Sequence, residues 1–226
     1  MSDIDHFAAE FLRPAPSRDP RSVVIYNRYG KRVLDICFAI ILLPVLAPLI
    51  VLLMGLVKLD GGPGHFRHRR VGRDGKPFEC LKIRTMATNA DAKLASHLST
   101  HPDAAREWKL TFKLASDPRI TKIGKFLRRT GLDELPQIWN VLRGEMSFVG
   151  PRPVTEPELA MYGRHKSAYF SVRPGVTGMW QIYGRRSGCY DNRVQLDRGY
   201  LEMISLKSDI ALIGQTALSV VRMTGS

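Results

Sequence analysis

The sequence predicts an α+β protein that is mostly helical, with a re-entrant membrane helix and a small cytoplasmic domain that contains a β-hairpin. Three observations predict this class: an apolar run with two internal prolines, two alternating segments around an Asp-Gly turn, and later segments with helical spacing between Pro- and Gly-rich loops. With 226 residues the chain has room for one globular domain. We divide it into an N-terminal tail (1–30), the membrane helix (31–58) and the cytoplasmic domain (59–226).

The apolar run of residues 36–57 has the length of a membrane helix. As a straight helix it would reach about 33 Å, enough for a hydrocarbon core of roughly 30 Å. However, Pro44 and Pro48 lie within it, and each removes a helical hydrogen-bond donor and kinks the helix. Basic residues flank both ends, so the positive-inside bias draws both ends to the cytoplasm. A re-entrant helix satisfies both observations, and a plain span is the alternative.

The segments after the membrane helix predict a hairpin followed by helices. Residues 65–71 and 77–83 flank a turn at Asp74-Gly75, which favours two antiparallel strands. Residues 87–116 look helical but are interrupted at His101-Pro102, so we expect two helices. Residues 119–129 carry apolar residues at near-helical spacing opposite lysines and arginines. Such a helix suits an anionic lipid surface, and a solvated basic face over an ordinary core is the alternative.

Prolines and glycines mark the remaining elements. Because a proline is tolerated in the first turn of a helix, Pro136 predicts a helix that starts near Leu132 or Asp133. Loops are expected around residues 150–153 and 173–175, and a helix near 193–206. The apolar helix expected after Ser208 has roughly fifteen residues, too few to span a membrane.

The charge of the chain predicts anionic partners. The net charge is +13, from 34 Lys and Arg against 21 Asp and Glu, which suits nucleic acid, acidic lipid headgroups or phosphorylated substrates. A nucleic-acid reader has no use for the apolar run, whereas a protein that acts on phosphates at a bilayer does. We therefore expect membrane lipid and phosphorylated substrates as partners, and no nucleic acid.

Asp133-Glu134 is an acidic doublet in a long basic neighbourhood. A structural role stays open, because acidic residues at a helix N-terminus cap the helix and match its dipole. The nearby cations exceed what a cap requires, which favours a functional role. A carboxylate kept ionised among arginines could bind Mg²⁺ beside a diphosphate, or attack phosphorus itself.

Several arginines stand next to prolines and glycines. Arg152 lies between two prolines, which fix the backbone and should hold its guanidinium ready for bidentate phosphate contact. Arg173 precedes Pro174-Gly175, and Arg185 follows Gly184. The alternative is that these arginines lie on rigid surface turns and bind no ligand. The predicted substrate-binding residues are Lys82, Arg84, Arg128, Arg152, Arg173 and Arg185.

Other common kinds of site are not predicted. The sequence has no Walker loop and no GxGxxG motif, which argues against ATP hydrolysis and a Rossmann cofactor. Its six histidines show no HExxH or triad-like arrangement. Cys37, Cys80 and Cys189 have no paired spacing, which argues against a disulfide scaffold and a cysteine-based zinc site.

Three strings carry a family resemblance: KIRTM (82–86), LRRTGLDELPQIWNVLRGEMSFVGPRP (127–153) and RPGVTGMWQIYGR (173–185). They strongly resemble the bacterial sugar transferase family, the monotopic polyprenyl-phosphate phosphoglycosyl transferases that begin exopolysaccharide, O-antigen and capsule repeat units. The resemblance covers about residues 30–220. The chain looks like the short form, and resembles the undecaprenyl-phosphate galactose and glucose phosphotransferases.

The resemblance implies an activity, a cofactor and roles for residues. A UDP-sugar, galactose before glucose, would give its sugar-1-phosphate to undecaprenyl phosphate and release UMP, with Mg²⁺ required. Asp133 matches the aspartate thought to form a phosphosugar-aspartyl intermediate, and Glu134 matches its partner at the metal, so both are expected metal ligands. Arg152 matches the arginine of the family's Pro-Arg-Pro motif. The catalytic domain would face the cytoplasm at the bacterial inner membrane.

The resemblance also implies a re-entrant helix broken by a Ser-Pro pair. The matching pair here is Ala47-Pro48, which keeps the proline and lacks the serine hydroxyl. Two other hypotheses remain at this point. In one, the lipid phosphate attacks directly in a ternary complex while the acidic doublet only holds Mg²⁺. In the other, the protein is a membrane-tethered basic scaffold for acidic polymers or lipids. The sequence identifies neither the sugar nor the oligomeric state.

Overall fold

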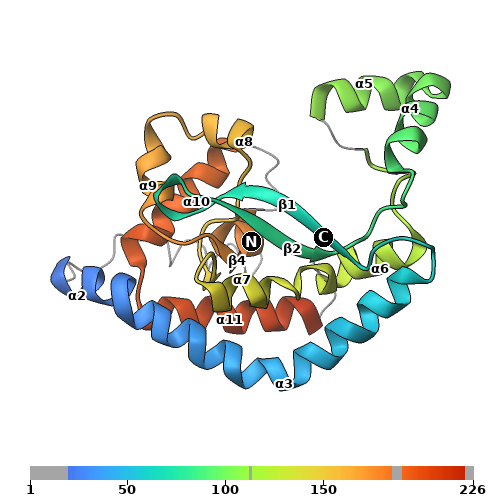
Figure 1. Ribbon diagram of the computed structural model, residues 1–226. Coiled ribbons are helices and arrows are strands. Elements are labelled where there is room, and N and C mark those ends of the chain that lie inside the picture. The colour runs from blue at the N-terminus through green and yellow to red at the C-terminus, as the bar shows by residue number, and fades with distance from the viewer. Residues whose placement is uncertain (1–19, 112–113, 185–189, 222–226) are drawn as a thin grey trace.

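The computed structural model describes residues 20–111, 114–184 and 190–221, and this part of the chain is mostly helical with two small sheets (Figure 1). Most of the predicted tail and the predicted residue Arg185 lie outside the described residues, whereas residues 20–30 are helical. The helices are α2 (Pro20–Ile25), η1 (Tyr26–Gly30), α3 (Lys31–Lys58), η2 (Arg73–Gly75), α4 (Ala90–Thr100), α5 (Pro102–Thr111), α6 (Lys122–Thr130), η3 (Leu132–Glu134), α7 (Gln137–Arg143), α8 (Glu156–Ala160), η4 (Gly163–His165), α9 (Lys166–Phe170), η5 (Trp180–Gly184), α10 (Tyr190–Met203) and α11 (Leu206–Val221). The strands are β1 (His65–Val71), β2 (Pro77–Ile83), β3 (Ser147–Val149) and β4 (Gly175–Thr177).

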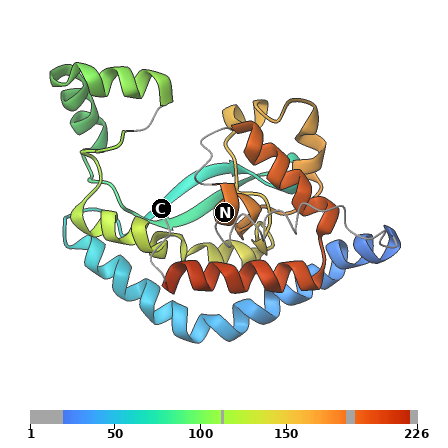
Figure 2. The same cartoon turned by 180° about the vertical axis from the view of Figure 1, so that it is seen from behind.

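Helix α3 is a long apolar helix that bows away from the rest of the protein. Figures 1 and 2 show both of its ends rising toward the sheets, while its middle lies farthest from them. Pro44 and Pro48 lie inside it and explain a bend, because each lacks the N–H donor. The segment Val23–Lys58 is long and apolar enough to cross a membrane, and 11% of its most apolar window is buried by the protein. Such an uncovered apolar surface needs surroundings other than water.

The N-terminal end of α3 is fixed by a buried ion pair. Lys31 Nζ lies 2.7 Å from the Asp209 carboxylate of α11, and both side chains are almost fully buried. The hydroxyls of Tyr26 and Tyr200 also donate to this carboxylate, each at 2.8 Å. Three donors therefore surround one buried carboxylate, which ties α3 to α11.

The next turn of α3 is fixed to the small parallel sheet. Asp35 accepts hydrogen bonds from the Ser147 hydroxyl and the Phe148 backbone N–H, both at 2.9 Å. These two residues belong to β3, which pairs with β4. The Asp35 side chain, near the start of α3, therefore fixes strand β3 to this helix.

The C-terminal end of α3 is fixed by Arg84. Its guanidinium is buried and donates to the carbonyls of Val57, Pro63 and Met86, at 3.1, 2.6 and 2.7 Å. It also forms an ion pair with Asp60. Both ends of the bowed helix are therefore tied to one side of the protein through charged side chains.

The predicted hairpin is confirmed. Strand β1 pairs with β2 in antiparallel register from His65↔Ile83 to Val71↔Pro77. At the turn, Asp74 and Gly75 both have positive φ, as Asp-Gly turns favour. The second sheet, β3–β4, is parallel, and the sequence analysis did not predict it.

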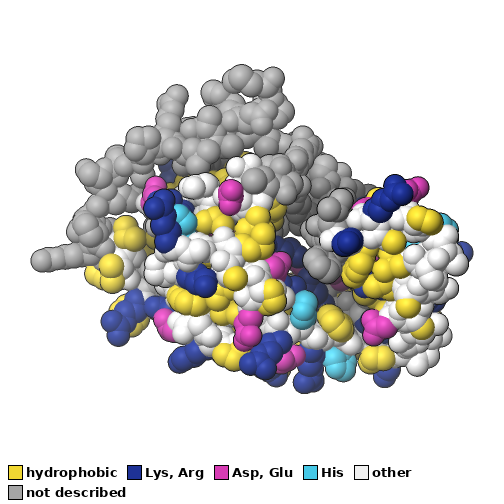
Figure 3. Space-filling model, turned by 90° about the horizontal axis from the view of Figure 1, so that it is seen from above, with side chains coloured by type: hydrophobic (Ala, Val, Ile, Leu, Met, Phe, Trp, Pro, Cys, Tyr) yellow, Lys and Arg dark blue, Asp and Glu magenta, His cyan; other side chains and the backbone are white. Residues whose placement is uncertain are grey.

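The predicted helices are partly confirmed. Helices α4 and α5 occupy the interrupted segment, and Figures 1 and 2 show them as an arm that projects on the side away from α3. Figure 3 views the molecule from the side on which this arm projects. It shows Lys and Arg side chains along one edge of the molecule and near the hollow between the arm and the rest of the protein. Helix α6 begins after Thr121, whose hydroxyl accepts the Gly124 N–H at 2.9 Å. The later helices begin earlier than expected, α10 at Tyr190 and α11 at Leu206.

The helix expected to begin at Leu132 or Asp133 was placed too early. Residues Leu132–Glu134 form the 3₁₀ turn η3, and α7 begins at Gln137. The backbone N–H groups of Glu134 and Leu135 bond to the third residue before them. Pro136 has no N–H with which to form the longer α-type bond to Leu132, so the turn before it stays 3₁₀.

We expect Lys31→Met to lower the free energy of unfolding by about 3–5 kcal/mol, because it leaves the buried Asp209 carboxylate without its cation. Asp209→Asn should have a comparable effect, and the double variant should cost less than the sum of the two. Unfolding of the purified protein in detergent micelles measures these values. The exposed pair of Arg106 and Asp103, 3.6 Å apart, is the control, since Arg106→Met should cost less than about 0.5 kcal/mol. Equal effects at Lys31 and Arg106 would contradict the assignment.

Candidate active site

The acidic doublet Asp133-Glu134 lies in the turn η3, between α6 and α7. Gly131 ends α6 with a φ of 73°, a conformation that glycine adopts without steric cost. Leu132 and Leu135 flank the doublet and pack against the apolar cluster that α3 forms with β2 and α6. Helix α3 therefore sets the position of the two carboxylates.

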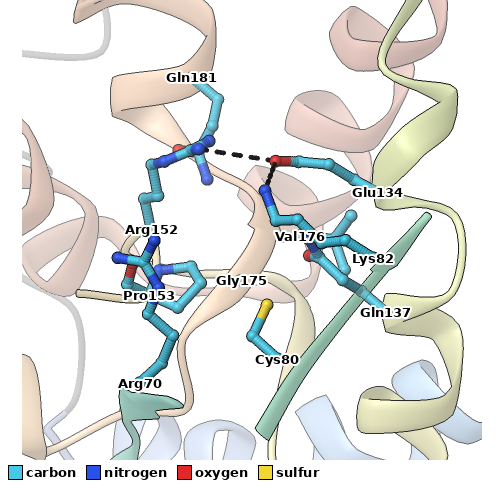
Figure 4. A pocket seen from close by; sticks show the side chains of 10 residues that line it. All are labelled: Arg70, Cys80, Lys82, Glu134, Gln137, Arg152, Pro153, Gly175, Val176 and Gln181. Atoms are coloured by element: carbon cyan, nitrogen blue, oxygen red, sulfur yellow. Dashed lines mark hydrogen bonds and ion pairs between the residues drawn. The ribbon is translucent and has the colours of Figure 1, made fainter. Parts of the chain in front are cut away.

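A small cleft opens beside Glu134 (Figure 4). Lys82 and Glu134 enter it from β2 and η3, and Arg152 and Gln181 enter from the opposite side. Its lining residues are Arg70, Cys80, Lys82, Glu134, Gln137, Arg152, Pro153, Gly175, Val176 and Gln181.

Glu134 is held between two cations. Lys82 Nζ donates to its carboxylate at 2.7 Å, and the Arg152 guanidinium lies 3.6 Å from the same oxygen. Figure 4 shows this bridge across the cleft. Two cations that share one carboxylate retain excess positive charge, which favours an anionic ligand.

Asp133 lies next to the cleft but is not among its lining residues. It is 8% exposed, and burial raises the pKa of its carboxyl above the ordinary range. Lys82 and Arg128 lower this pKa, while the charge of Glu134 raises it further. Desolvation therefore opposes the ionised form that the surrounding cations favour.

The remaining predicted substrate-binding residues are scattered. Arg128 lies near Asp133 and donates to the Thr85 hydroxyl at 2.8 Å. Arg84 fixes the end of α3, as described above, and does not line the cleft. Arg173 donates to the Gly144 carbonyl at 2.8 Å, and burial lowers its pKa. The structure thus brings Lys82 and Arg152 into the cleft, places Arg128 beside it, and positions Arg84 and Arg173 elsewhere.

Comparison with known proteins agrees with the sequence resemblance. The model of the family described as bacterial sugar transferase matches residues 26–223. The chain belongs to the bacterial sugar transferase family. It is 47% identical over 200 residues to the UDP-galactose-lipid carrier transferase of Erwinia amylovora, covering 88% of this chain and 42% of that protein. It is 45% identical over 200 residues to the undecaprenyl-phosphate galactose phosphotransferase of Salmonella typhimurium, with the same coverage.

A relative of similar length is also found in this family. The exopolysaccharide production protein ExoY of Sinorhizobium fredii is 47% identical over 198 residues, which cover 87% of this chain and 88% of that protein. In contrast, the chain spans 42% of the length of the two galactose-related transferases. The residues matched by the family model, 26–223, include the acidic doublet, the cleft and the apolar helix.

Several residues of this sugar transferase cleft were missed by the sequence analysis. Arg70 lies on β1 and forms an ion pair with Glu158 at 2.8 Å. Cys80 is fully buried, and burial raises its thiol pKa. Gln137 and Gln181 carry no charge, and no role was predicted for either, although both lie within strings that carry the family resemblance. The alternation of β1 could have indicated Arg70, whereas the only sequence signal for the two glutamines is their place within the family strings.

The described residues fit a divalent cation only together with a substrate. Among them, no group of three His, Cys, Asp or Glu side chains comes together as a metal site. Mg²⁺ is commonly held by one or two carboxylates, while substrate phosphates and water supply the other ligands. The Asp133-Glu134 doublet fits an ion that binds together with a diphosphate.

Asn140 links the strand of Lys82 to the helix that follows the doublet. It is fully buried, and its amide accepts the Leu81 backbone N–H at 3.0 Å. Its NH₂ group donates to the Glu79 carbonyl at 2.8 Å and to the Glu145 carboxylate at 2.6 Å. The side chain therefore pairs with the free edge of β2 as a neighbouring strand would, and holds Lys82 in register with Glu134.

We expect Asn140→Asp to lower the free energy of unfolding by about 2–4 kcal/mol. The variant keeps the acceptor for Leu81, loses both donated bonds and places a second carboxylate beside Glu145. Denaturant unfolding measures the change. The exposed Asn192 supplies the matched control, because Asn192→Asp should stay within about 0.5 kcal/mol of the wild type. If the two variants were equally stable, Asn140 would not be the link between β2 and α7.

Proposed function

We propose that the protein transfers sugar-1-phosphate from a UDP-sugar to undecaprenyl phosphate and releases UMP, as the first step of exopolysaccharide repeat-unit synthesis. Galactose is the preferred sugar and glucose the next. The observation that carries the proposal is the Glu134 carboxylate between Lys82 and Arg152, beside Asp133, in a member of the sugar transferase family. Two relatives with 45–47% identity are named as a UDP-galactose-lipid carrier transferase and an undecaprenyl-phosphate galactose phosphotransferase.

The cations of the cleft bind the diphosphate of the sugar donor. Without substrate, Lys82 and Arg152 have Glu134 as their shared partner. A diphosphate brings more negative charge and more acceptor oxygens than one carboxylate, so it replaces Glu134 as their main partner. Asp133 precedes Glu134 in the turn η3, so a phosphate bound to these cations would lie near its carboxylate.

The transfer proceeds in two displacements at the phosphorus that carries the sugar. A carboxylate oxygen of Asp133 forms a bond to this phosphorus, while the bond from phosphorus to the UMP oxygen breaks and UMP keeps the electron pair. An oxygen of undecaprenyl phosphate then bonds to the same phosphorus, and the Asp133 carboxylate leaves. Both nucleophiles are anions, so no general base is required, and none of the described cleft-lining residues is a histidine.

A divalent cation would be held by Asp133 and Glu134 together with the phosphates. When bound, Mg²⁺ neutralises charge on the diphosphate and on the leaving UMP. Lys82 and Arg152 supply the same kind of stabilisation from the protein side.

The lipid acceptor is reached because α3 sits in the cytoplasmic leaflet as a re-entrant helix. The bowed shape, the two internal prolines and the attachment of both helix ends to one side of the protein support this arrangement. Helix α6 supports it as well, because Ile123 and Phe126 are 41% and 44% exposed beside its lysines and arginines. The doublet would then lie at headgroup depth, on the cytoplasmic face of the inner membrane.

We expect the wild type to release about one UMP per active site from UDP-galactose before any lipid acceptor is added, because Asp133 accepts the phosphosugar first. Asp133→Asn should release none, because an amide cannot perform the displacement. Rapid-quench UMP assays and the intact mass of the phosphohexose adduct measure this. Chelation of Mg²⁺ should stop release. UMP that forms only when donor and acceptor are both present would instead support direct attack in a ternary complex.

The stability of Asp133→Asn separates catalysis from folding. Because burial raises the Asp133 pKa, the folded state keeps this proton to a higher pH than the unfolded chain does. The contribution of this group to stability therefore falls as pH rises from the unfolded pKa through the folded pKa. Replacing the buried charge with an amide should leave the unfolding temperature at pH 7 equal to or above that of the wild type. A marked loss of stability would point to a structural role.

The re-entrant topology predicts that the N-terminus faces the cytoplasm. In a variant whose three native cysteines are replaced, Asp5→Cys should be protected from a membrane-impermeant maleimide in intact cells and labelled after lysis, because both flanks of the helix would lie inside. Labelling in intact cells would show that the helix spans the membrane.

A further inference from the structure

The amide of Gln181 lies in the cleft with both of its polar atoms unused. Nε2 and Oε1 are buried, and neither has a hydrogen-bond partner among the described residues. Oε1 lies 3.2 Å from the point that a Cβ on Gly178 would occupy, so a larger residue there would crowd the amide. A buried amide without partners is costly, and proteins keep such groups where a ligand supplies the missing bonds.

The surroundings of Gln181 indicate what kind of group it meets. Figure 4 shows Gln181 and Arg152 pointing into the cleft from the same side, facing Glu134 and Lys82. The cations among these residues suit phosphate, whereas an amide is neutral and offers a donor and an acceptor side by side. Gln181 therefore suits a neutral group with adjacent donors and acceptors that is attached directly to the phosphate.

The hexose of a nucleotide sugar fits this description better than the uracil. The hexose is bonded to the second phosphate, whereas the uracil is separated from the phosphates by the ribose. A base pocket commonly offers an aromatic face for stacking, and none of the described lining residues is aromatic. Adjacent hexose hydroxyls match the amide well, since one can donate to Oε1 while its neighbour accepts from Nε2.

We propose that Gln181 is a specificity-determining residue that binds a pair of neighbouring hydroxyl groups on the donor hexose. This inference rests on the proposed function and adds the residue that reads the sugar. The same contact would orient the hexose of the phosphosugar bonded to Asp133 after UMP leaves, because it does not depend on the nucleotide.

The test compares Gln181→Met with the wild type on UDP-galactose and on a series of UDP-monodeoxygalactoses that each lack one ring hydroxyl. Methionine keeps the approximate length of the side chain and removes both polar atoms. We expect kcat/KM for UDP-galactose to fall about tenfold, and to fall much less for the analogue that lacks the contacted hydroxyl. Inhibition by UMP should be unchanged. The exposed Gln195 on α10 is the matched control, and Gln195→Met should retain wild-type values.

Each other outcome overturns the assignment. Unchanged kinetics in Gln181→Met would show that the amide makes no contact with the donor. Equal losses on every analogue, together with weaker UMP inhibition, would mean that Gln181 reads the nucleotide. Should Gln181→Met lose its cooperative unfolding transition, Gln181→Asn allows the same comparison, because it keeps the amide and is one methylene shorter. Failure of the wild type to release UMP from any UDP-sugar would instead reject the proposed function.

Discussion

The buried ion pair between Lys31 and Asp209 fixes the apolar helix to the rest of the protein, and the geometry of the cleft depends on where that helix lies. A charge pair removed from water is stable only when its remaining donors and acceptors are also satisfied, and two tyrosine hydroxyls complete the shell here. Arg84 performs the same task at the other end of the helix. Charged anchors of this kind permit few alternative positions, so α3 is held in one orientation against the sheets.

Apolar packing fixes the two carboxylates relative to α3, together with two side chains that form hydrogen bonds to backbone groups. Leucines on both sides of the acidic doublet pack against the cluster formed by the C-terminal half of α3. Arg32 of α3 donates to the last carbonyls of α7, those of Val141 and Leu142. Asn140 of the same helix pairs with the edge of β2, which carries Lys82. Lys82 and the carboxylate of Glu134 are thus both positioned relative to α3. A phosphate bound between them would have a defined place relative to the apolar surface.

Local sequence patterns predicted the elements whose contacts are close in sequence. They could not predict contacts between segments that are far apart in the sequence. The hairpin followed from an Asp-Gly turn between alternating strands, and α6 from helical spacing, because each depends on neighbours in sequence. Strands β3 and β4 have three residues each and pair across 28 positions, from Ser147 to Gly175, so no periodicity announces them. Among the candidate site residues, a basic side chain near glycine and proline looked the same in sequence whether it faced the cleft, as Arg152 does, or bonded to a backbone carbonyl elsewhere, as Arg173 does. Gln181 lies in a family string but carries no charge, and its significance appears only when its buried amide is seen without partners.

The two members of the acidic doublet have opposite environments, and this difference suits them to different tasks. Glu134 faces the cleft and already bonds to Lys82, so its carboxylate compensates cations that would otherwise repel each other. Asp133 is withdrawn from water, which raises its pKa and removes the solvation shell that would weaken it as a nucleophile. Two solvated carboxylates at this place would compete equally for the cations and would repel an incoming diphosphate. With one carboxylate paired and the other buried, the cleft keeps net positive charge, and under the proposed mechanism the nucleophile stays out of water until a phosphate binds.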